Sequence, residues 1–150
     1  MPMQKIRNRG NNMNDIERRE TKEAIDAAED ALYHLYLARK QLGSAGNWGL
    51  LDIFGGGLIS GLIKHSKMSD AEREIEEARY SLQRFSKELR DVTGYSSIHI
   101  DEFLTFADFV FDGLLADVWV QSKISKAKEQ CDDAIVRVSQ IKSELEARLN

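Results

Sequence analysis

The stretch that decides the fold is residues 71–92, which read AEREIEEARYSLQRFSKELRDV. Its apolar residues follow one another at alternating steps of four and three positions, and this spacing places them along one side of an α-helix. We call such a line of apolar positions a seam. The seam in this stretch, the second along the chain, consists of Ala71, Ile75, Ala78, Leu82, Phe85, Leu89 and Val92.

Two further seams lie on either side of it. The first consists of Ala24, Ala28, Ala31, Leu35, Ala38 and Leu42, and the third of Ile124, Ala127, Cys131, Ala134, Val138, Ile141 and Leu145. Three seams predict an all-α protein, an elongated antiparallel helical bundle or coiled coil. Because many functions share this kind of scaffold, the fold does not by itself specify an activity.

The first helix is expected to begin at Asn14, because Glu17 follows at the spacing of a reciprocal N-terminal cap. It is expected to end at Leu42, where Gly43 can adopt the left-handed conformation that closes many helices. Its side chains other than the seam residues are mostly polar.

The second helix is expected to run from Ser69, which forms a capping box with Glu72, to Gly94. A third helix is expected from Asp101, with no proline or glycine pair before Leu149. Its first part, 101–120, carries acidic residues on one side and aromatic residues on the other. A single helix of this length would extend roughly 70 Å.

A continuous third helix would leave the third seam without a partner in the same chain. Such a bare seam is an oligomerisation surface, so we expect a homo-oligomer, a dimer or higher, in which Val138 and Ile141 lie at the interface. The alternative is that the chain folds back near Gly113 or Gln121, which would cover the seam.

The composition fits one bundle domain over residues 14–150, preceded by a basic arm over residues 1–13 that is expected to be disordered. The arm contains Lys5, Arg7 and Arg9. The net charge of −4 and the pI of 5.4 argue against nucleic acid as a partner. The single cysteine, Cys131, lies in a seam and suits a reducing compartment, and no signal peptide is visible, so we expect a cytoplasmic protein.

A segment of low charge separates the first two seams. Residues 46–63, GNWGLLDIFGGGLISGLI, contain one charged residue, Asp52, and six of the ten glycines. The segment lacks the lysine and hydroxyl residue of a phosphate loop. We expect it to form two short helices, near 47–54 and 57–65, that cap the bundle. The apolar candidates for interaction are Trp48, Leu51, Phe54, Leu58 and Leu62.

Two interpretations of this cap stay open. In the first, its apolar side chains pack against Phe103, Phe106 and Val110. In the second, the cap inserts into a membrane surface, with Lys64 and His65 meeting anionic lipids. The segment 64–67 is also a candidate anion site at a helix start, although a solvated linker is the simpler interpretation.

The remaining polar patterns do not form a catalytic set. Asp26, Asp30 and His34 follow one another at steps of four, but no second histidine lies at an equivalent place, so a solvated helix face is favoured over a metal site. Asp117 falls on the apolar side of its helix, where a buried carboxylate must be either paired or neutral, and a polar contact with a lysine or arginine of a neighbouring helix is expected. We therefore expect no enzyme activity, no metal and no cofactor.

The stretch 55–71, GGGLISGLIKHSKMSDA, resembles the inter-helix segment of small uncharacterised bacterial helical-bundle proteins. The resemblance implies an intracellular bacterial bundle and no particular activity. The expected function is that of a non-enzymatic interaction or scaffold protein, acting through helical self-association or through docking of a protein partner. The alternative is a peripheral membrane-binding protein that inserts the glycine-rich segment.

Overall fold

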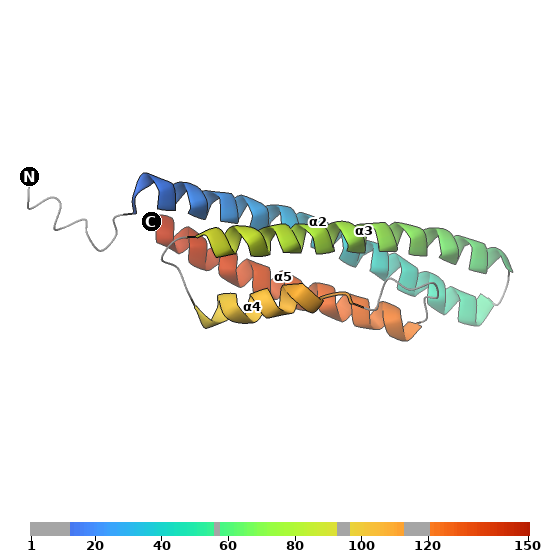
Figure 1. Ribbon diagram of the computed structural model, residues 1–150. Coiled ribbons are helices and arrows are strands. Elements are labelled where there is room, and N and C mark those ends of the chain that lie inside the picture. The colour runs from blue at the N-terminus through green and yellow to red at the C-terminus, as the bar shows by residue number, and fades with distance from the viewer. Residues whose placement is uncertain (1–12, 56–57, 93–96, 113–120) are drawn as a thin grey trace, which may run out of the picture.

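The structure is a computed structural model that describes residues 13–55, 58–92, 97–112 and 121–150, with side chains outside 44–69 and position 121. Residues 1–12 of the expected basic arm lie outside these ranges, and so does Asp117. The described chain is helical throughout and elongated (Figure 1), which confirms the predicted all-α fold. Its helices are α2 (Asp15–Gly55), α3 (Leu58–Asp91), α4 (Ile98–Phe109) and α5 (Gln121–Leu149).

The four helices pack in a ring in which each touches two others. The backbone of α2 approaches α3 and α5 closely, and α4 approaches the same two helices from the other side, whereas the backbones of α2 and α4, and of α3 and α5, stay farther apart within the described residues. α5 runs in the opposite direction to α4. Along the contact, the residue numbers on α5 fall while those on α4 and the turn after it rise. The pairs are His99 with Glu144, Phe106 with Arg137, and Phe111 with Gln130.

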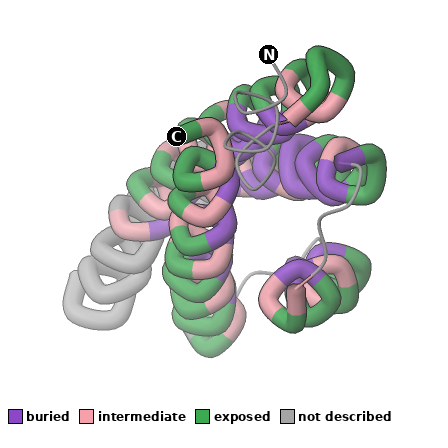
Figure 2. Tube along the Cα trace, turned by 90° about the vertical axis from the view of Figure 1, so that its left-hand side faces the viewer, coloured by how far each residue is buried: buried purple, intermediate pink, exposed green. Residues whose placement is uncertain are grey.

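The three seams form the core. Every seam residue is buried, with an exposed fraction of at most 4%. α4 adds Ile100, Phe103 and Ala107, and the rings of Phe103 and Phe85 lie 5.2 Å apart between α4 and α3. Figure 2 shows the buried positions of the helices turned toward one another. The core positions predicted from the first two seams are thus confirmed, whereas the third seam, expected at an interface between copies, is buried within the single chain.

The predicted cap of the first helix is also confirmed. The Asn14 side chain accepts a hydrogen bond from the Glu17 backbone N–H at 2.8 Å and donates one to the Glu17 carboxylate at 3.2 Å. The first of these bonds satisfies the Glu17 N–H, a backbone donor that has no partner within the helix, and the second joins the two side chains. Together they fix the start of α2 at Asp15.

The predicted end of the first helix and the predicted start of the second are wrong, and Gly94, the expected stop of the second, lies outside the described residues. α2 continues through Gly43 to Gly55, and α3 begins at Leu58, so Ser69 and Glu72 lie inside a helix. A glycine costs a helix only about 1 kcal/mol relative to alanine, which the tertiary packing of a long helix offsets. The segments 47–54 and 57–65 therefore continue the two long helices as a hairpin and are not separate short helices.

A single helix from residue 101 to residue 149 is likewise wrong. α4 ends at Phe109, and Phe111 adopts a left-handed backbone conformation with φ of 66°. Phe111 is fully buried, and its N–H donates to the Gln130 side chain on α5 at 3.1 Å. Burial and this hydrogen bond offset the steric cost of the left-handed conformation. The chain folds back, and α5 places the third seam on α2.

The aromatic side of α4 is covered by α3 and α5, not by the glycine-rich segment as one interpretation expected. Phe103 contacts Phe85, which lies roughly 40 Å along α3 from Leu58 at 1.5 Å per residue. Because α2 and α3 do not break at Leu42 and Ser69, the glycine-rich segment stays at the far end of the hairpin.

We predict that Leu82→Ala and Phe85→Ala each lower the free energy of unfolding by about 2–5 kcal/mol, because each empties a fully buried position. Chemical denaturation followed by circular dichroism measures the change. Tyr80→Ala is the matched control, since Tyr80 on the same helix is 65% exposed and should cost little. Equal losses in all three variants would contradict the packing of α3.

We also predict that Val138→Glu combined with Ile141→Glu unfolds the protein, because both residues are buried within one chain. Had the third seam been an interface between copies, the same double variant would give a folded monomer. Circular dichroism and light scattering together distinguish the two outcomes. A folded, helical monomer would show that α5 does not pack as described.

Candidate functional site

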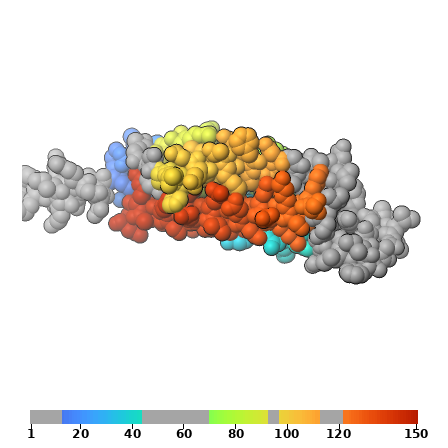
Figure 3. Space-filling view, turned by 90° about the horizontal axis from the view of Figure 1, so that it is seen from below, coloured from blue at the N-terminus to red at the C-terminus, as the bar shows by residue number. Residues whose placement is uncertain are grey.

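α4 lies alongside α5 on one face of the molecule (Figure 3), and an open groove of about 710 Å³ follows their contact. The groove is lined by Asp101, Glu102, Thr105, Phe106 and Arg137. α4 supplies the first four of these residues and α5 supplies the last, so the groove exists only because the chain folds back after Phe109.

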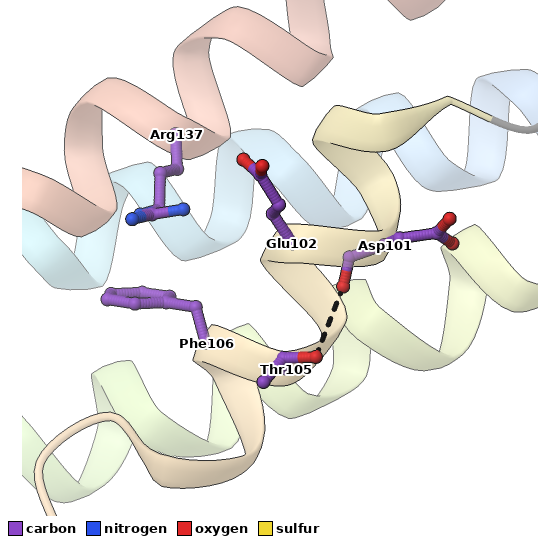
Figure 4. Close-up of a pocket in the computed structure, with 5 residues that line it drawn as sticks. All are labelled: Asp101, Glu102, Thr105, Phe106 and Arg137. Atoms are coloured by element: carbon purple, nitrogen blue, oxygen red, sulfur yellow. Dashed lines mark hydrogen bonds between the residues drawn. The ribbon is translucent and has the colours of Figure 1, made fainter.

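An arginine stacked on an aromatic ring forms the floor of the groove. The Arg137 guanidinium lies over the Phe106 ring, 4.7 Å from its centre (Figure 4). Its Nε also donates to Asp133 at 3.2 Å, one turn back on α5. Stacking of this kind is worth about 0.5–1 kcal/mol at an exposed site. The guanidinium is thus held between the Phe106 ring and the Asp133 carboxylate.

His99 fastens the start of α4 to α5. Its Nδ1 lies 2.8 Å from the Glu144 carboxylate, and its Nε2 lies 3.4 Å from the Gln140 amide nitrogen. The first turn of α4 is capped by Ser97, whose side chain accepts from the Ile100 N–H. These polar contacts fix how α4 sits on α5 and therefore fix the width of the groove.

The outer surface of α4 is acidic. Asp101, Glu102 and Asp108 are exposed, and α4 contains no lysine or arginine. In the part of the chain that the structure describes, none of these three carboxylates makes an ion pair. Figure 4 shows the Glu102 side chain directed toward α5 and the Asp101 carboxylate directed away from Phe106.

The stripe of Asp26, Asp30 and His34 includes a contact between helices. The Asp30 carboxylate accepts from the buried Ser81 hydroxyl at 3.0 Å and lies 3.8 Å from Arg84 on α3 and 3.6 Å from His34. Asp30 therefore joins α2 to α3, whereas the sequence pattern favoured a solvated face. Over the described ranges, no three His, Cys, Asp or Glu side chains are grouped to hold a metal ion.

The sequence-predicted interaction residues fall in two places. Trp48, Leu51 and Phe54 belong to α2, and Leu58, Leu62, Lys64 and His65 belong to α3, so the fold brings both groups to the closed end of the α2–α3 hairpin. Their side chains lie outside the described part of the structure. Val138 and Ile141 are instead core residues with exposed fractions of 0% and 1%.

Cys131 is a buried core thiol. Desolvation by burial raises its pKa to about 12, and the nearby Asp132 carboxylate adds to this, while Arg39 acts in the opposite direction. Arg39 and Asp132 themselves form an ion pair at 2.8 Å between α2 and α5. A thiol in this environment stays protonated at neutral pH and is a poor nucleophile.

Sequence reasoning missed the groove and its stacked pair. Phe106 was recognised as an aromatic residue of its helix, but nothing in the seams indicated that Arg137 would cover it. The available signal was the absence of basic residues on 98–109, which leaves that helix with unbalanced acidic charge.

No protein-family model, curated protein or solved structure matches this chain. The resemblance to small bacterial helical-bundle proteins therefore stays a prediction. In the described part of the chain, no helix combines the length and the apolar character needed to cross a bilayer.

We predict that the folded protein loses stability in alkaline solution because its buried Cys131 thiol stays protonated while the thiol of the unfolded chain ionises. The pKa is near 9.0 in the unfolded chain and about 12 in the folded protein, so only the unfolded state loses the proton between these values. Stability should fall with rising pH by about 1.4 kcal/mol per unit in this window. The measurement is the difference in unfolding free energy between wild type and Cys131→Ala at each pH.

Taking this difference cancels the effect of lysine and tyrosine titration on the unfolding free energy, because the two proteins share those residues. The wild type should lose stability faster than Cys131→Ala above pH 9.0. Parallel pH profiles of the two proteins would show that the thiol is not buried as described.

Proposed function

We propose that this protein is a non-enzymatic interaction or scaffold protein, an elongated antiparallel bundle that associates through the closed end of its α2–α3 hairpin. The observation that carries the proposal is that this end extends beyond the other helices and has an apolar sequence. Residues 46–63 contain one charged side chain, Asp52, in a protein of which 31% is charged. An apolar sequence at a projecting end of an elongated molecule is suited to docking.

The register of the helices supports this placement. Counted from the Arg39–Asp132 pair, α2 runs on to Gly55, whereas α5 begins at Gln121. At 1.5 Å per residue, the end of α2 lies about 8 Å beyond the start of α5. Counted from the Arg79–Asp112 pair, α3 reaches roughly 30 Å past α4. In Figure 1 the hairpin end lies beyond both α4 and α5.

The fold also changes which surface is available for self-association. The third seam, on which the expectation of a dimer rested, is covered by α2 of the same chain. The hairpin end then becomes the site of helical self-association or of docking to a protein partner. Among the residues with described side chains, other large apolar residues are also exposed on outward helix faces, as on most proteins. They include Tyr33, Tyr80 and Val136.

We predict that the wild type self-associates with rising concentration and that Leu58→Lys combined with Leu62→Lys returns it to a monomer of 17.1 kDa. Charged side chains at the hairpin end oppose apolar contact between copies. Light scattering after gel filtration, from low to high micromolar protein, measures the mass. Thermal unfolding should be nearly unchanged in the variant, because the four-helix core lies elsewhere.

Tyr80→Lys is the matched control, since Tyr80 lies on the outward face of the same helix and is 65% exposed. Its mass should follow that of the wild type. A wild type that stays at 17.1 kDa at every concentration would contradict self-association. Unfolding of the double variant would show that the hairpin end belongs to the core.

A peripheral membrane function is the second candidate, because Lys64, His65 and Lys67 adjoin the apolar segment on α3. Trp48 reports on it directly once the other tryptophan is removed as Trp119→Phe. Anionic phospholipid vesicles should leave Trp48 fluorescence unchanged if the hairpin end docks to protein. A blue shift with vesicles at physiological salt, lost in the Leu58→Lys, Leu62→Lys variant, would instead support membrane insertion.

A further inference from the structure

The outward side of α4, together with the groove beside it, is an unpartnered helix face in the described structure. Ile98 and Phe109, at the two ends of α4, are 68% and 66% exposed. Glu102 and Thr105 lie between them at steps of four and three, so the four residues follow one line along the helix. This line borders the groove whose floor is the Phe106 ring under Arg137.

The charges of this face favour a basic occupant. Asp101, Glu102 and Asp108 have no ion-pair partner among the described residues. The one cation in the groove, Arg137, is already bound to Asp133 and stacked on Phe106. An occupant with several positive charges and a few apolar side chains would complement both the carboxylates and the exposed aromatic surface.

We propose that residues 1–12 of the same chain, MPMQKIRNRGNN, dock along this face of α4 and into the groove. This segment has three basic residues, Lys5, Arg7 and Arg9, and no acidic residue. Met3 and Ile6 supply apolar side chains for the Phe106 and Phe109 rings.

The geometry of the chain permits this contact. α2 begins at the end of the molecule where α5 finishes and where α4 starts (Figure 1). Arg137 lies about 18 Å along α5 from Leu149 at 1.5 Å per residue. Ten residues of extended chain span roughly 33 Å, which covers this distance and the passage around α5.

Paramagnetic broadening tests the contact directly. A nitroxide placed on Thr105→Cys, an exposed position at the groove, should broaden the amide signals of residues 3–9 in dilute salt. The loss of intensity is measured against the same sample after the nitroxide is reduced. Cys131 is buried and should not react with the nitroxide reagent. Wild-type protein treated with the same reagent should therefore carry no nitroxide.

The broadening should disappear in about 1 M salt, where charges are screened beyond about 3 Å, and in the Asp101→Asn, Glu102→Gln variant. A nitroxide on Tyr80→Cys, on the outward face of α3, is the matched control and should not broaden these signals. Circular dichroism melts establish that each labelled protein and the charge variant are folded.

Three results would overturn the proposal. The first is no broadening from position 105, and the second is equal broadening from position 80. The third comes from a mixture of two samples, isotope-labelled protein without nitroxide and protein without isotope label that carries the nitroxide. Undiminished broadening in this mixture would mean that the segment docks on a second copy. Broadening that is confined to position 105 and to a single chain, and that salt abolishes, supports the proposal.

Discussion

The packing of two helices on the alanine-rich seam of α2 is the contact on which the rest of the structure depends. Small side chains let helix backbones approach closely, so α3 and α5 can both reach α2 along one stripe. Both helices are held on α2 and their backbones stay apart from each other, so the far side of the space between them must be filled, and α4 fills it with bulky rings. The side chains are thus small on the α2 side of the core and large on the α4 side. The small residues are Ala24, Ala28, Ala31 and Ala38, and the large ones are Phe85, Phe103 and Phe111.

The core was predictable from sequence because burial repeats with the period of the helix. Every residue of the three seams is buried, and the Asn14 cap lies where its spacing with Glu17 indicated. The ends of the helices were not predictable, since they depend on competing small energies. At Gly43 a helix stop was expected, but the intrinsic cost of glycine is about 1 kcal/mol and packing outweighs it. At Phe111 the reverse holds, because burial and Gln130 end a helix that local propensity would have continued.

The surfaces were predictable only in part. The glycine-rich segment was identified from its composition, and the fold brings its two halves to one end of the molecule. Val138 and Ile141 were assigned to an interface because a straight last helix would have exposed them, and folding back after α4 buries them instead. The groove was missed, since Phe106 and Arg137 are distant in sequence and meet through tertiary packing. A heptad pattern locates the buried side of each helix but does not specify which helices become neighbours.

The central claim is that α5 packs its seam on α2 of the same chain. Isotope-filtered nuclear Overhauser spectroscopy tests this claim most directly, through contacts of the methyl groups of Leu35 and Leu42 on α2 with those of Ala134 and Ala127 on α5, which the Arg39–Asp132 pair places at matching heights. In uniformly labelled protein, contacts between the two seams should be present. In an equal mixture of labelled and unlabelled chains refolded together, a filter that passes only contacts between different chains should show none. Strong α2–α5 contacts through that filter would mean that the third seam pairs with another copy, and would contradict the single-chain core.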